Sequence, residues 1–148
     1  MSQHLNVPLR SPSPDCRRFL RAVTTDYRPA RPPLIEYIVD RAVLEPVLGM
    51  IGRQWAPPGP EREALEAWCD NFIAFWHHMG YDFVRLEIGL GWTFPGRPGG
   101  IRGREYAETG VGPIATAAQF DAYPWPDPDA VDFFCYDYIT AHLPEGMG

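Results

Sequence analysis

The sequence predicts an α/β fold, and within that class the N-terminal part of a TIM (β/α)8 barrel with about two parallel strands and four to five helices. Two short apolar runs rich in β-branched and aromatic residues, 33–40 and 81–91, predict the strands. Helical stretches separate them, and strands joined by a helical crossover pair in parallel. Two parallel strands are too few for a stable sheet, and a complete barrel needs roughly 250 residues. Because the chain has 148 residues, we expect 15–148 to be a truncated, N-terminal part of such a barrel, after a flexible lead-in over 1–14.

The first half of the chain predicts a helix, a strand and two further helices. Asp15 precedes "CRRFLRAVT", whose apolar residues share one face, so we expect a capped helix there. After the first strand, "RAVLEPVLGMIGRQW" (41–55) is a helical stretch with Pro46 near its start and glycines that weaken its end. The strongest helix is predicted over 61–80, because apolar residues recur there at i, i+3, i+4 and i+7 and Gly80 takes the C-cap.

The second half predicts a strand, a long glycine-rich loop over 92–113 and two helices. "TAAQFDAY" opens with Thr116 and has Gln119 three residues later, which is the spacing of a capping box. The final helix should have Asp127 as its N-cap and Pro128 as its first residue. Its predicted buried face consists of Val131, Phe134, Cys135, Tyr138, Ile139 and His142.

Charge and residue usage exclude several kinds of function. The net charge is -6 and every basic residue is an arginine, so the chain supplies neither a Schiff-base lysine nor a P-loop lysine. An acidic chain is a poor ligand for nucleic acid or a membrane surface, and no segment offers about 18 consecutive apolar residues. We therefore expect a cytoplasmic protein with no nucleic-acid or membrane partner. Three widely spaced cysteines without a Cys-x-x-Cys motif predict neither a disulfide framework nor a zinc ribbon.

Three segments, taken in order, resemble the uroporphyrinogen decarboxylase superfamily. They are "RRFLRAVTTDYRPARPPLIEYIVD" (17–40), "FWHHMGYDFVRLEIG" (75–89) and "GPIATAAQFDAYPWPDPDAVDFFCYDYITAHLPEGMG" (112–148). The superfamily includes heme-pathway decarboxylases and corrinoid-linked methyltransferases, all built on a TIM barrel. The resemblance implies a full-length protein that acts as a carboxy-lyase on a tetrapyrrole. Decarboxylation of this type needs no cofactor, because it depends on charge placement that stabilises the intermediate.

Two departures from the superfamily's patterns leave alternatives open. The decarboxylases carry an Arg-Gln-Ala-Gly-Arg segment that binds substrate carboxylates, whereas this chain has "EYIVDRAVLEP" there and offers Arg41 alone. The methyltransferases bind zinc through a His-x-Cys pair and a later cysteine, which have no equivalent here, so no metal site is predicted. One alternative is a corrinoid (cobalamin)-dependent methyltransferase-like enzyme, which would use zinc or a corrinoid and a methyl-donor small molecule. The other is a non-catalytic tetrapyrrole-binding relative.

The second predicted strand carries charges on one face. Alternation places Arg85 and Glu87 together, opposite an aliphatic face that should pack against helices, so the charges should line the barrel mouth. Parallel pairing would set Glu36 and Asp40 of the first strand beside them. The decarboxylases place an essential aspartate near this position, and Glu87 is the nearest acid. We predict Glu87 and Arg85 as catalytic residues and Glu36, Asp40 and Arg41 as substrate-binding residues. An interior ion pair of Arg85 with Glu36 or Glu87 is the competing interpretation.

Several other residues are weaker candidates. His77 and His78 end a predicted helix, where solvated imidazoles are a simpler interpretation than metal ligands. Cys69 and Cys135 lie on apolar helical faces and should belong to the core. The arginines of the glycine-rich loop either clamp an anionic substrate or are solvated. These arginines are Arg97, Arg102 and Arg104. Wide apolar stripes on the helices also predict self-association of the chain.

Overall fold

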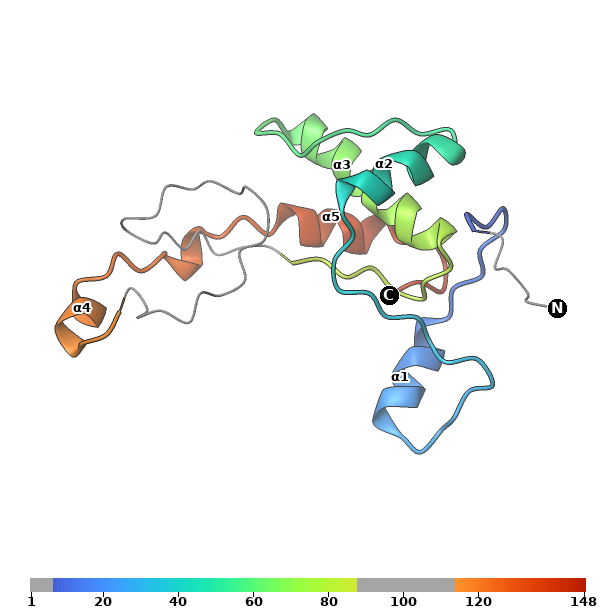
Figure 1. Ribbon diagram of the computed structural model, residues 1–148, viewed down its shortest axis with the longest axis horizontal. Helices are drawn as coiled ribbons and strands as arrows, with labels where there is room; N and C mark the ends of the chain where they lie inside the picture. Colours follow the sequence, from blue (N-terminus) through green and yellow to red (C-terminus); the bar gives the residue numbers. More distant parts are fainter. Residues whose placement is uncertain (1–6, 88–113) are drawn as a thin grey trace. The chain divides into compact units, whose positions relative to one another are not determined.

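The computed structural model describes residues 7–87 and 114–148, and its described elements are helical (Figure 1). The helices are α1 (Cys16–Thr24), α2 (Arg41–Met50), α3 (Arg62–His78), α4 (Ala117–Asp121), the 3-10 turn η1 (Pro128–Ala130) and α5 (Phe134–His142). The chain divides into two compact units. The first consists of Met1–Leu86 with Phe133–Gly148, and the second of Glu87–Asp132.

The prediction of an α/β fold built on two parallel strands, as part of a TIM barrel, was wrong. Neither 33–40 nor 81–87 is a strand in the structure, and residues 88–91 of the second predicted strand lie outside the described part. The run 33–40 is irregular, with large apolar side chains exposed at Ile35 and Ile38. A strand needs a partner along its whole length, and β-forming residues alone do not supply one.

The two predicted strands meet through the side chain of Arg85 instead of through a backbone ladder. Arg85 Nη1 donates to the backbone oxygen of Tyr37 at 2.7 Å. The backbone of the second segment pairs with Gly148, since Val84 N donates to Gly148 O at 2.8 Å and Gly148 N donates to Asp82 O at 3.1 Å. Both of these backbone bonds involve the single residue Gly148, so the pairing does not extend into a sheet.

Three helix ends follow the predicted capping residues. The side chain of Asp15 accepts a hydrogen bond from Arg18 N at the start of α1. Gly80 follows the end of α3 with φ +83°, a conformation that favours glycine. The capping box of Thr116 and Gln119 is present in α4.

Two predicted helices are shorter in the structure. The stretch 41–55 is helical only over α2, and Gly52 lies beyond its end with φ +77°. Asp127 and Pro128 begin η1 rather than the final helix, and α5 starts at Phe134.

The core of the first unit forms on both sides of α3. Towards α2, Leu44 and Leu48 pack with Phe75 and Trp76 of α3 and with Met147. A second cluster joins α3 to α5 and consists of Cys69, Ile73 and Ile139. Figure 1 shows α2 and α5 beside α3, which is the longest described helix. The apolar residues whose spacing predicted α3 therefore pack on two faces of the helix, one towards α2 and one towards α5.

The segment 146–148 is held between two other parts of the first unit. Gly146 O accepts a hydrogen bond from Cys16 N at 2.8 Å, while Gly148 is bonded to the backbone of Asp82 and Val84. Met147 lies between these anchors and is buried. The segment thereby connects the first turn of α1 with the residues after α3.

We expect Gly146→Ala to lower the free energy of unfolding by about 2–3 kcal/mol. Gly146 has φ +82°, and an added Cβ would collide with the backbone oxygen of Pro14. Gly52→Ala is a matched control, because Gly52 has φ +77° but open space around it, and should cost only about 1 kcal/mol. Equilibrium urea unfolding of both variants measures the difference. Equal losses would show that the contact with Pro14 is not restrictive.

Candidate functional site

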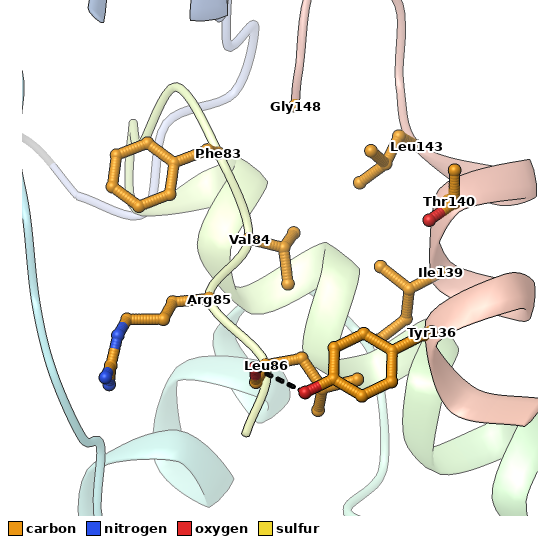
Figure 2. Close-up of a pocket in the computed structure, with 9 residues that line it drawn as sticks. All are labelled: Phe83, Val84, Arg85, Leu86, Tyr136, Ile139, Thr140, Leu143 and Gly148. Atoms are coloured by element: carbon orange, nitrogen blue, oxygen red, sulfur yellow. Dashed lines mark hydrogen bonds between the residues drawn. The ribbon is translucent and has the colours of Figure 1, made fainter. Parts of the chain in front are cut away.

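A small pocket lies between residues 83–86 and α5 (Figure 2). Its volume is about 260 Å³, and Leu86, Ile139 and Leu143 are among the side chains that line it. The hydroxyl of Tyr136 donates a hydrogen bond to Leu86 O at 3.2 Å. Ligand pockets are commonly about 300–1,000 Å³, so this one suits a small apolar group rather than a whole macrocycle.

Arg85 borders the pocket, but its charged end points away from it. Figure 2 shows the guanidinium directed away from Tyr136 and Ile139. It donates to Tyr37 O at 2.7 Å, and its central carbon lies 3.8 Å from the centroid of the Tyr37 ring. Tyr37 is 60% exposed, and this stacking is a favourable cation–π geometry. The pair therefore presents a cation and an aromatic ring together near the protein surface.

Glu36 contacts the same residue. Its carboxylate accepts a hydrogen bond from Tyr37 N at 2.8 Å, so Glu36 and Arg85 both hold the backbone of Tyr37. The structure thus brings these two predicted site residues together. We refer to Glu36, Tyr37 and Arg85 as the Tyr37 site.

Two of the other predicted site residues, Asp40 and Arg41, lie at the start of α2. Asp40 is the N-cap residue of α2, with no side-chain capping bond. Arg41 donates to Glu45 at 2.9 Å on the exposed side of α2. Glu87 is exposed and belongs to the second unit.

Sequence reasoning missed the most enclosed ion pair among the described residues. The side chain of Asp82 is 3% exposed, and Arg18 Nη2 lies 2.7 Å from each of its carboxylate oxygens. Asp15 N donates to the same carboxylate at 2.9 Å. The hydrogen bond to Asp82 raises the pKa of Arg18, although burial acts in the opposite direction. The signal was present in the alternation, because Asp82 falls on the aliphatic face, where a charge requires a partner.

The two histidines at the end of α3 are half-buried rather than fully solvated. His78 Nδ1 lies 2.7 Å from Leu9 O, which can only accept, so this nitrogen carries the proton. Burial and the neighbouring His78 lower the pKa of His77. Both line a second pocket of about 220 Å³ with Arg53, Asp70 and His142. Within 7–87 and 114–148, no group of three or more potential ligands is arranged to hold a metal ion.

The remaining predictions concern the cysteines and the loop arginines. Cys69 is buried and Cys135 is half-buried in the α3–α5 cluster, which confirms their place in the core. The loop arginines at 97, 102 and 104 lie outside the described residues. Among the helices that the structure describes, none has the length and apolar character needed to span a bilayer.

Comparison with protein-family models finds no match, and searches of curated proteins and solved structures find none either.

Proposed function

We propose that this protein binds a carboxylated tetrapyrrole and that it is a relative of the uroporphyrinogen decarboxylase superfamily, whose activity would be that of a carboxy-lyase. The proposal starts from the three sequence segments that resemble the superfamily. Residues 82–86 belong to one of them and are hydrogen-bonded to both of the others. Arg18 and Tyr37 of the first segment contact Asp82 and Arg85, and Gly148 of the third contacts Val84. Parts of all three segments therefore contact one another within the first unit.

The Tyr37 site is the observation that carries the proposed ligand class. A tetrapyrrole with acidic side chains combines a large apolar ring system with carboxylates on its rim. An exposed aromatic ring offers stacking to such rings, and a guanidinium offers charge-assisted hydrogen bonds to the carboxylates. Ile35 and Ile38 flank Tyr37 in the sequence and are 64% and 63% exposed, so the segment adds apolar area. The macrocycle would lie on this surface, because the neighbouring pocket is too small to enclose it.

A decarboxylase would use the guanidinium of Arg85 to orient a substrate carboxylate and to stabilise charge that develops as carbon dioxide leaves. Glu36 would position this group indirectly, since its carboxylate fixes the backbone of Tyr37. No step in this scheme requires a metal or an organic cofactor.

A non-catalytic tetrapyrrole-binding role is the second candidate, and one observation favours it. Acid–base chemistry needs an ionisable group within hydrogen-bond reach of the substrate. Glu36 is hydrogen-bonded to Tyr37 N, and Arg41 is paired with Glu45, so both are engaged locally. The geometry therefore supports binding more directly than it supports turnover. No comparable observation favours the corrinoid-dependent methyltransferase.

Binding is tested by titrating the purified protein into uroporphyrin III while recording the main visible absorption band. We expect a saturable shift for the unaltered protein. Arg85→Ala should raise the Kd by about 10–100-fold, because a hydrogen bond to a charged group contributes roughly 1.5–3 kcal/mol. Arg17→Ala removes an exposed arginine of α1 and should change the Kd by less than about two-fold.

Activity is then measured as carbon dioxide released from reduced uroporphyrinogen. Release supports the carboxy-lyase, whereas tight binding without release supports the binding role. If uroporphyrin III does not bind, the proposed ligand class is wrong. If binding is unchanged in Arg85→Ala, the ligand class holds but the Tyr37 site does not.

A further inference from the structure

Two of the three thiols of the chain lie in one core cluster between α3 and α5. Cys69 of α3 is completely buried and Cys135 of α5 is half-buried. The cluster around them consists of aliphatic and aromatic side chains, including Ile73 and Ile139. The third thiol, Cys16, is in neither core cluster.

The thiol of Cys135 packs against the buried cluster that contains Cys69. Cys69 and Ile73 are four residues apart on α3, and Cys135 and Ile139 are four residues apart on α5, so each pair occupies successive turns of one face. Neighbours of the cysteines also join the two helices. The Tyr138 hydroxyl donates to Asp70 Oδ1 at 3.2 Å, and the Arg62 guanidinium lies 3.9 Å from the centroid of the Phe134 ring.

The environment gives the two sulfur atoms different reactivity. Burial, together with a hydrogen bond to the Cys135 thiol, raises the pKa of Cys69 to about 12. Cys69 therefore remains a protonated thiol near neutral pH and reacts slowly with soluble reagents. Cys135 is the more exposed of the two, so a small oxidant reaches its sulfur first.

We propose that Cys69 and Cys135 are an oxidative modification site, at which a peroxide converts the two thiols into a disulfide that joins α3 to α5. The Cys135 thiolate attacks one oxygen of hydrogen peroxide, an S–O bond forms and the O–O bond breaks. This gives a sulfenic acid and, after proton uptake, water. The sulfur of Cys69 then attacks the sulfur of Cys135, the S–S bond forms, and the hydroxyl leaves with the thiol proton as a second water. Two thiols are oxidised by two electrons in total, and one peroxide is reduced to two waters.

The disulfide would restrain the wall of the pocket described above, since α5 contributes Tyr136 and Ile139 to it. It would also close a long loop of chain that contains the whole second unit. Loop closure lowers the entropy of the unfolded chain, so we expect the oxidised protein to unfold at a Tm about 5–15 °C higher.

The test treats the purified full chain with one equivalent of hydrogen peroxide and counts the remaining thiols by maleimide labelling under denaturing conditions. We expect the three free cysteines to fall to one, and the intact mass to decrease by two hydrogen atoms. Peptide mapping without reductant should identify a Cys69–Cys135 link. Dithiothreitol should restore the labelling and remove the rise in Tm.

Two variants separate this pair from other oxidation. Cys16→Ser removes the thiol outside the cluster and should leave the link and the rise in Tm intact. Cys135→Ser should abolish both the link and the rise in Tm. This variant changes the half-buried cysteine and leaves the buried Cys69 in place. The proposal is overturned if peroxide leaves three labelled thiols, if Cys135 accumulates as sulfinic acid without a link, or if the link involves Cys16.

Discussion

Asp82→Ala is expected to lower the free energy of unfolding by about 2–3 kcal/mol. The substitution leaves Arg18 without its buried partner and Asp15 N without its acceptor. Removing one member of a fully buried pair typically costs about 3–5 kcal/mol. We expect a smaller loss here because 30% of the Arg18 side chain is exposed and its charge can be solvated. Equilibrium urea unfolding measures the loss.

Glu45→Ala is the matched control for this ion pair. Its carboxylate is paired with Arg41 at 2.9 Å on the surface of α2, and the two side chains are 49% and 65% exposed. Such pairs contribute about 0–1 kcal/mol, so the unfolding midpoint should hardly move. If Asp82→Ala and Glu45→Ala have the same midpoint, the carboxylate at 82 does not hold α1 to the rest of the first unit.

Leu48→Ala should lower the free energy of unfolding by about 3–5 kcal/mol. Leu48 is 0% exposed and packs with Phe75, Trp76 and Met147, so truncation leaves a cavity that the surrounding rings fill poorly. The same urea experiment measures the loss.

Met50→Ala is the control on the same helix. Met50 is two residues further along α2 and is 68% exposed, so its truncation should change stability by less than about 0.5 kcal/mol. A loss of less than about 1 kcal/mol for Leu48→Ala would mean that α2 does not pack stably against α3 in solution.

Local signals in the sequence predicted the helices and several of their ends. The cap at Asp15 and the capping box at Thr116 depend on residues within four positions of one another, so a single sequence contains all the information. The same is true of the apolar spacing of α3 and of Gly80 after it. Side chains close in the sequence meet in a helix whatever the rest of the fold does.

The two strand predictions were wrong because side-chain composition does not identify a pairing partner. Residues 33–40 have β-forming side chains, but a ladder depends on a second segment that local composition does not identify. The predicted neighbourhood of 33–40 and 81–87 is present in the structure at Tyr37 and Arg85. Its form differs, since a guanidinium and a ring make the contact in place of paired backbones.

In the candidate site, too, local sequence signals identify single residues but not their long-range partners. Arg85 stood out because a charge interrupts an apolar run, and its partner Tyr37 could not be inferred from that pattern. Alternation places Asp82 on the aliphatic face, opposite Arg85, and does not indicate that its buried carboxylate pairs with Arg18. Long-range partners such as Arg18 follow from the path of the whole chain, which no local window contains.

The packing around Trp76 should also contribute to the near-UV circular dichroism of the protein. Its ring meets those of Phe75 and Tyr81 at interplanar angles of 83° and 88°, and all but 2% of the residue is shielded from solvent. A rigidly held indole in such asymmetric surroundings produces near-UV circular dichroism, which disappears when side chains lose their fixed packing while helices persist. The near-UV spectrum of this protein therefore distinguishes a natively packed α3 from a helical but molten one.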